Sequence, residues 1–200
     1  MKVEVLDNSL CAKVDSLFGL GLSYGLTSGI PIKKFNIDEH GDIYNRLLKI
    51  ATKLAHVGNG ENKFLRQLPV SLDITAPMYW WKEFDTYKVG TTAQSESTMH
   101  TLLRNTITQD NFEKFVSEDT IAHLEDLRVN KKFSELINEL PMGWLQRRIV
   151  TCNYAVLQNM YNQRKNHKLP EWHIFCSAVL KGVDHPEWID KDYKPETEAE

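Results

Sequence analysis

The sequence predicts a single globular domain that combines β-strands with several helices. Residues 2–5 and 68–76 alternate apolar and polar side chains, as half-buried strands do. Elsewhere, apolar residues recur at spacings of three and four, which is typical of amphipathic helices. Two hundred residues, 42% of them hydrophobic, are enough to bury one sizeable core. No linker or internal repeat divides the chain.

The first third of the chain contains one short strand, one glycine-rich segment and one helix. Val3 and Val5 alternate with charged residues and predict the strand. Residues 17–29 carry several glycines, but not at the spacing of a G-x-G-x-x-G loop, so phosphate binding and packing both stay open. Residues 38–57 carry a helical apolar stripe.

An aromatic helix is expected directly after the clearest strand, which spans residues 68–76. Pro77 suits the first turn of a helix, and the following residues read as helical until Gly90. Trp80, Phe84 and Tyr87 lie at i, i+4 and i+7. This stripe is compatible with stacking on a flat ligand and with packing in the core.

Hydroxyl side chains crowd the segment after this helix. They belong to Thr91, Thr92, Ser95, Ser97 and Thr98. Such residues cap helices and also bind phosphate, so the segment is a candidate for either role.

The second half of the chain is predicted to be helical. The expected helices cover residues 117–127, 133–137, 143–165 and 170–179. In the long helix, Asn153 and Arg164 would share one face, three turns apart. Residues 190–200 are charged and lack apolar periodicity, so we expect a disordered acidic tail after a domain of residues 1–189.

Composition excludes several classes of protein. The formal net charge of -3 and the absence of a basic stripe argue against binding of duplex nucleic acid. No apolar run is long enough for a membrane span, and three widely spaced cysteines fit a reducing compartment, so we expect a cytoplasmic protein. The seven histidines show no ligand spacing and no Cys-x-x-Cys occurs, so no metal site is expected.

The segment APMYWWKEFDTYKVGTTAQSES resembles the signature region of the flavin-dependent thymidylate synthases. In that family a strand leads into Ala-Pro, an aromatic stretch, Arg-Gln-aromatic, Arg-His-Arg-x-x-Ser and Asn-Glu-x-Ser-x-Arg. Here the corresponding residues are Ala76-Pro77, Lys82-Glu83-Phe84, Thr86-Tyr87-Lys88 with Thr91 and, after one inserted residue, Gln94-Ser95-Glu96-Ser97 with Met99.

A second block, LPMGWLQRRIVTCNYAVLQNMYNQR, is similar to the family's Leu-Pro followed by Asn-x-Arg-x-Leu-x-Asn-Phe-x-x-x-Arg. Asn153, Leu157, Asn159 and Arg164 match this pattern, while Ala155 stands in place of an arginine. The two blocks follow one another in the family's order.

The resemblance implies an α+β subunit, with a small antiparallel sheet and several long helices, that assembles as a homotetramer. It implies a methyltransferase in which FAD carries hydride from NADPH, and a one-carbon unit moves from methylenetetrahydrofolate to deoxyuridylate (dUMP). The flavin would lie by Tyr87, Lys88, Thr91, Asn153 and Asn159. The pyrimidine nucleotide would contact Lys82, Glu83, Gln94, Ser95, Glu96, Ser97 and Arg164, with Ser97 as the catalytic residue.

The departures from the family pattern fall on residues that bind ligands. Lysine in place of arginine keeps the charge and loses the bidentate fork, whereas Thr86, Met99 and Ala155 lose both. Each lost charged hydrogen bond weakens phosphate binding by about 1.5–3 kcal/mol. Three functions are therefore compatible with the sequence: a diverged flavin enzyme acting on a pyrimidine nucleotide, a nucleotide-binding protein that sequesters or senses its ligand without catalysis, and a structural or partner-binding protein.

Overall fold

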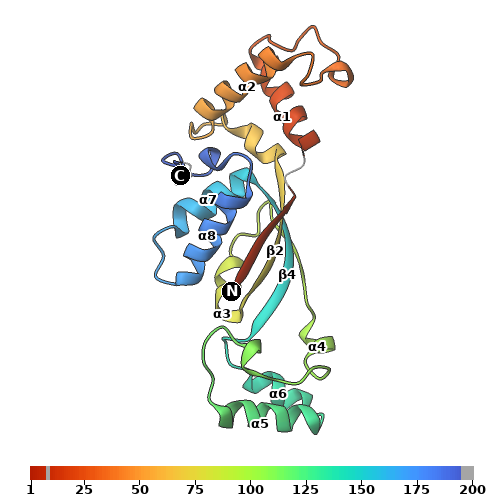
Figure 1. The fold of residues 1–200 in the computed structure, drawn as a ribbon, viewed down its shortest axis with the longest axis vertical. Coiled ribbons are helices and arrows are strands. Elements are labelled where there is room, and N and C mark those ends of the chain that lie inside the picture. Colours follow the sequence, from red (N-terminus) through yellow and green to blue (C-terminus); the bar gives the residue numbers. More distant parts are fainter. Residues whose placement is uncertain (8–9, 195–200) are drawn as a thin grey trace, which may run out of the picture.

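An antiparallel sheet runs through the middle of the molecule, and helices lie beside it and at both of its ends (Figure 1). The computed structural model describes residues 1–7 and 10–194. Within them, four strands pair in the order β1-β2-β4-β3, and their bounds are β1 (Lys2–Asp7), β2 (Pro69–Pro77), β3 (Thr92–Ser95) and β4 (Leu145–Asn153). The architecture confirms the predicted α+β class with a small antiparallel sheet.

The central pair of strands, β2 and β4, is aligned from Pro69 opposite Asn153 to Pro77 opposite Leu145. Val70, Leu72 and Ile74 of β2 are fully buried, as their alternation with polar residues predicts. β1 pairs with the other side of β2, so the predicted opening strand is also confirmed.

The predicted long helix over residues 143–165 is wrong in its first half, which forms β4. Only the second half is helical, as α7 (Tyr154–Arg164). The apolar spacing in residues 145–156 fits a helix, but the consecutive β-branched residues Ile149, Val150 and Thr151 favour a strand, and β2 offers a long partner. Asn153 therefore precedes α7 and caps it, so Asn153 and Arg164 do not share a helical face.

Two helices pack together at one end of the sheet. They are α1 (Leu10–Ser23) and α2 (Gly41–Leu54), of which α2 confirms the helix predicted over residues 38–57. Gly21 lies inside α1, where a Cβ atom would stand 2.7 Å from Thr27 Cγ2. The glycine-rich segment thus serves packing at Gly21.

One face of the sheet is covered by aromatic helices. The elements are α3 (Met78–Phe84), α7 and α8 (Pro170–Gly182) (Figure 1). Trp80 and Phe84 of the predicted stripe are buried there, so packing accounts for these two residues. Tyr87, the third, lies in the loop after α3. The predicted continuation of α3 to Gly90 is wrong, because the helix ends at Phe84 and Thr86 Oγ1 donates to Glu83 O at 2.7 Å.

A second, smaller hydrophobic cluster lies at the opposite end of the sheet. It includes Leu124 of α5 (Glu118–Val129), Leu136 of α6 (Phe133–Glu139) and Leu102, which directly follows α4 (Thr98–Thr101). Short 3-10 helices connect other elements: η1 (Ile32–Lys34), η2 (Lys63–Gln67), η3 (Gln109–Asn111) and η4 (Pro186–Trp188).

The end of the described chain packs against α7, where Tyr161 donates a hydrogen bond to Asp190 Oδ2 at 2.8 Å. The predicted tail over residues 190–200 lies outside the described residues from position 195 onward. Among the described helices, none combines the length and the apolar character that crossing a bilayer requires.

Candidate functional site

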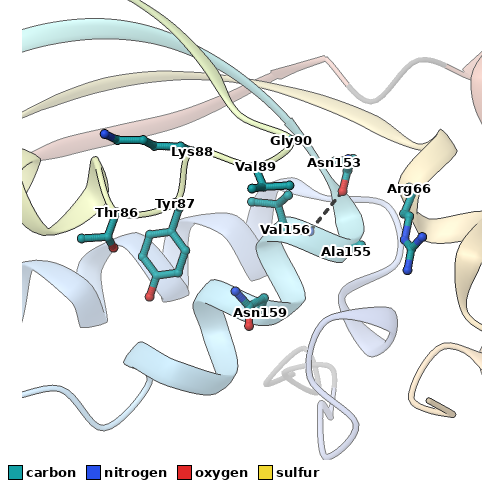
Figure 2. Close-up of a pocket in the computed structure, with 10 residues that line it drawn as sticks. All are labelled: Arg66, Thr86, Tyr87, Lys88, Val89, Gly90, Asn153, Ala155, Val156 and Asn159. Carbon is teal, nitrogen blue, oxygen red and sulfur yellow. Dashed lines mark hydrogen bonds between the residues drawn. The ribbon is translucent and has the colours of Figure 1, made fainter. Parts of the chain in front are cut away.

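A pocket of about 450 Å³ opens where β4 ends and α7 begins. We call it the junction pocket. Its wall consists of Arg66 from η2, residues 86–90 of the loop after α3, and residues near the start of α7 (Figure 2). The complete lining is Arg66, Thr86, Tyr87, Lys88, Val89, Gly90, Asn153, Ala155, Val156 and Asn159.

Four of the five residues assigned to flavin by the resemblance line this pocket: Tyr87, Lys88, Asn153 and Asn159. The fifth, Thr91, lines an adjoining hollow of about 310 Å³ that shares Tyr87 and Lys88 with it. The Thr91 hydroxyl oxygen is buried and has no hydrogen-bond partner among the described residues. A buried polar atom without a partner is costly, so a polar ligand group that reaches this hydroxyl would relieve that cost.

Asn153 and Gly90 shape the wall between the loop and α7. The Asn153 Oδ1 atom accepts the backbone N–H of Val156 at 3.1 Å, which caps the helix. Gly90 has a φ of +75°, and a Cβ atom there would stand 3.0 Å from Val156 Cγ2. Glycine therefore allows both the left-handed turn and the close approach of the loop to the helix.

A hydrogen-bond network holds Tyr87 and Asn159 in place. The Tyr87 hydroxyl donates to Gln163 Oε1 at 2.9 Å and accepts from Arg164 Nε at 2.8 Å. Gln163 Nε2 in turn donates to Asn159 Oδ1 at 3.0 Å. Two residues that line the pocket are thus oriented by side chains behind them.

Arg164 is paired with a carboxylate of its own chain. Its Nη1 donates to Glu83 Oε2 at 2.8 Å, and the indole of Trp172 donates to the same oxygen at 2.9 Å. The guanidinium carbon also lies 4.8 Å from the centre of a Trp172 ring. Glu83 and Arg164, both expected to contact the nucleotide, are therefore in contact with each other.

The remaining residues assigned to the nucleotide lie elsewhere. Gln94, Ser95 and Glu96 line a separate hollow of about 540 Å³, together with Arg147 and Ile149. Ser97 is exposed and precedes α4, and Lys82 is exposed on α3. Among the described residues, the hollow at Gln94, Ser95 and Glu96 is thus lined by neither Glu83 nor Arg164.

Other chemistries find little support in the described residues. No three His, Cys, Asp or Glu side chains gather there as a metal site would require. Burial raises the pKa of the Cys152 thiol to about 12, which makes this thiol a poor nucleophile.

Sequence reasoning missed Arg66 as a member of the site. It lies outside both motif blocks, and its only signal in the sequence is its place just before the clearest strand. Val89 and Val156 were also missed, because they line the pocket only once the loop folds over α7.

No protein-family model and no curated protein matches the sequence. Solved structures do match the fold. The flavin-dependent thymidylate synthase ThyX from Helicobacter pylori, complexed with FAD and dUMP, aligns with a TM-score of 0.72 at 14% identity, over 97% of this chain and 100% of that one. A second structure of that enzyme with FAD and dUMP aligns with a TM-score of 0.69 at 15% identity, over 96% and 98% of the two chains.

A UMP/dUMP methylase, PolB from Streptomyces cacaoi bound with 5-Br dUMP, aligns with a TM-score of 0.59 at 11% identity. The alignment covers 90% of this chain and 88% of that one. These similarities confirm the fold that the sequence resemblance implied. At such low identities they show the fold alone, and the roles of individual residues stay predictions.

Proposed function

We propose that this protein is a diverged flavin-dependent enzyme that binds FAD in the junction pocket and acts on a pyrimidine deoxynucleotide. One observation carries the proposal: four residues assigned to flavin from two separate sequence blocks line one pocket. The fold in which they do so resembles enzyme structures that contain FAD and dUMP.

The chemistry of the pocket suits a flavin nucleotide. Asn153 and Asn159 offer amide groups, Val89 and Val156 offer apolar contact, and Lys88 offers a cation. The partnerless hydroxyl of Thr91 adds a polar group in the adjoining hollow. Bound FAD would supply hydride transfer, with NADPH and methylenetetrahydrofolate as co-substrates.

The residues of this chain would then bind and orient the reactants. The network behind Tyr87 and Asn159 limits their movement, which lowers the cost of ordering a bound ring. A pyrimidine nucleotide whose phosphate meets Arg164 would share this guanidinium with Glu83. The pairing weakens the attraction for the phosphate, because the positive charge is already partly neutralised.

We also propose that the nucleotide site is completed between subunits of a homotetramer. The proposal is supported by the separation of Arg164 from Gln94, Ser95 and Glu96, which line a hollow that does not include Arg164. A cytoplasmic location is proposed as well, and it is supported by the free, buried thiols of Cys152 and Cys176.

A second candidate is a nucleotide-binding protein without turnover. The ion pair between Glu83 and Arg164 favours this candidate, because Glu83 already neutralises the cation that is expected to bind phosphate. The uncharged residues Thr86 and Ala155 in the pocket wall favour it further, since each stands where the resembling family has arginine.

A thermal-shift and turnover experiment separates the two candidates. Purified protein reconstituted with FAD is mixed with dUMP, and its unfolding temperature is compared with that in deoxyuridine. Stabilisation by dUMP together with oxidation of NADPH in the presence of methylenetetrahydrofolate supports the enzyme. Stabilisation without NADPH oxidation supports the binding protein. No stabilisation by any pyrimidine nucleotide overturns both.

A further inference from the structure

The junction pocket has an unbalanced set of charges. Its ten lining residues include two cations, Arg66 and Lys88, and no carboxylate. The first turn of α7 borders the pocket through Ala155 and Val156 and adds the positive end of a helix dipole. The potential in this pocket therefore favours an anionic group.

Arg66 differs from the arginines nearest to the site. Arg148 binds Asp85, with 2.8 Å between Nη1 and Oδ1, and Arg164 binds Glu83. Arg147 is likewise paired, with Asp73. Arg66 has neither an ion pair nor a side-chain hydrogen bond within residues 1–7 and 10–194, although it lines the pocket. Its five donors are free for a ligand.

The backbone that carries Arg66 is fixed against the core. Phe64 and Leu65 of the same 3-10 helix are buried, and Ser16 Oγ donates to Phe64 O at 2.9 Å. The next segment is tied to α7, because the backbone N–H of Tyr154 donates to Leu68 O at 3.1 Å. The position of Arg66 relative to the start of α7 is therefore set by buried contacts.

Arg66 and Ala155 lie at the end of the pocket away from Thr86 and Tyr87 (Figure 2). Ala155 has neither charge nor length, and it stands where the resembling family carries an arginine. We propose that Arg66 supplies the guanidinium that position 155 lacks, and that it binds a phosphate or diphosphate group of the pocket's ligand. This inference rests on the proposed function, in which that ligand is a nucleotide.

A guanidinium suits this role better than the ammonium of Lys88. It presents a planar set of donors that matches two phosphate oxygens at once, and it is always charged. Arg66 is thereby assigned as a binding residue that enters the site from η2, an element outside both motif blocks.

The test compares Arg66→Ala with Arg46→Ala, which removes an exposed arginine of α2 outside the pocket. Each variant and the wild type are titrated with FAD and riboflavin, and with dUMP and deoxyuridine. The pairs differ in their phosphate groups, so they show whether the flavin nucleotide or the pyrimidine nucleotide provides the anion. The unfolding temperature of each ligand-free variant confirms that it is folded.

We expect Arg66→Ala to weaken binding of one phosphate-bearing ligand by about ten- to a hundred-fold. Binding of its phosphate-free partner should change by less than about twofold, and Arg46→Ala should change neither. Arg66→Lys should fall between wild type and alanine, because it keeps the charge and loses the fork. The inference is overturned if Arg66→Ala weakens binding of both members of each pair equally. It is also overturned if Arg66→Ala binds FAD and dUMP as tightly as the wild type does.

Failure of the proposed function gives a different result. Wild-type protein would then bind neither flavin nor pyrimidine nucleotide. In that case inorganic pyrophosphate serves as the probe. Thermal stabilisation of the wild type that is lost in Arg66→Ala still supports anion binding by Arg66. Absence of stabilisation in the wild type overturns it.

Discussion

Replacing Glu83 with glutamine tests the ion pair in which Glu83 neutralises the Arg164 guanidinium. The amide keeps the size of the side chain and one acceptor oxygen for Trp172, but it removes the negative charge. The Arg164 side chain is only 18% exposed and that of Glu83 31% exposed. Arg164 would therefore stay half-buried without its counter-ion.

The magnitude follows from the degree of burial. Breaking a fully buried pair from one side costs about 3–5 kcal/mol, whereas an exposed pair contributes about 0–1 kcal/mol. In this pair about a third of the Glu83 side chain stays exposed to water. We therefore expect Glu83→Gln to lower the free energy of unfolding by about 1–2 kcal/mol, between these two limits.

Urea unfolding followed by tryptophan fluorescence measures this change. The matched control is Glu61→Gln, an exposed glutamate with no side-chain partner in the described part of the chain. It should change stability by less than about 0.5 kcal/mol. A Glu83→Gln variant as stable as the control variant would refute the reasoning.

The same substitution has a consequence for ligand binding. Once its counter-ion is neutral, Arg164 becomes more attractive to a phosphate group. We expect Glu83→Gln to bind dUMP more tightly relative to deoxyuridine, by up to about tenfold. An unchanged ratio of the two affinities would show that Arg164 does not meet the phosphate.

Three further predictions concern the junction and the buried thiols. Gly90→Ala should lower the free energy of unfolding by roughly 1–3 kcal/mol, because alanine is strained at a φ of +75°. The control Gly143→Ala, which has open space at its Cβ position, should have little effect, and equal losses of the two variants in chemical denaturation would contradict this. Asn153→Ala should lower the free energy of unfolding by about 1 kcal/mol, because it removes the side-chain cap of α7. Asn153→Asp should keep most of this stability, and an aspartate variant no more stable than the alanine variant would contradict the capping role. Burial raises the pKa of Cys152 and Cys176 to about 12, so at pH 8 only about one thiol in ten thousand is ionised. Mass-spectrometric labelling should modify both far more slowly in the folded protein than in urea, and rapid labelling of either one in the folded state would refute this.

The elements that the sequence predicted well are those with a single strong period. β2 alternates apolar and polar residues, and the apolar residues are the buried ones. β4 was missed because the polar residues Gln146 and Arg148 share its inward face with Val150 and Cys152, so its sequence shows no clear apolar alternation. β3 carries only exposed residues, so it has no apolar alternation, and pairing with β4 is what makes it a strand.

The candidate site could be located from the sequence, but its internal contacts could not. Motif resemblance joined the loop after α3 to the start of α7, and both line the junction pocket. The bond between Glu83 and Arg164 spans 81 residues and depends on how α3 packs against α7 and α8. Arg66 reaches the pocket only because buried residues of η2 fix its backbone there.

An equilibrium titration with FAD, on wild type and on Ala155→Trp, tests the central claim most directly. Ala155 is partly exposed in the wall of the pocket, so an indole at this position fills space that the flavin would occupy. Saturable binding to the wild type, with the visible absorption bands of flavin retained after ultrafiltration, is the predicted result, and the tryptophan variant should lose it. A wild type that retains no flavin, or a tryptophan variant that binds FAD as tightly, would contradict the claim that FAD binds in the junction pocket.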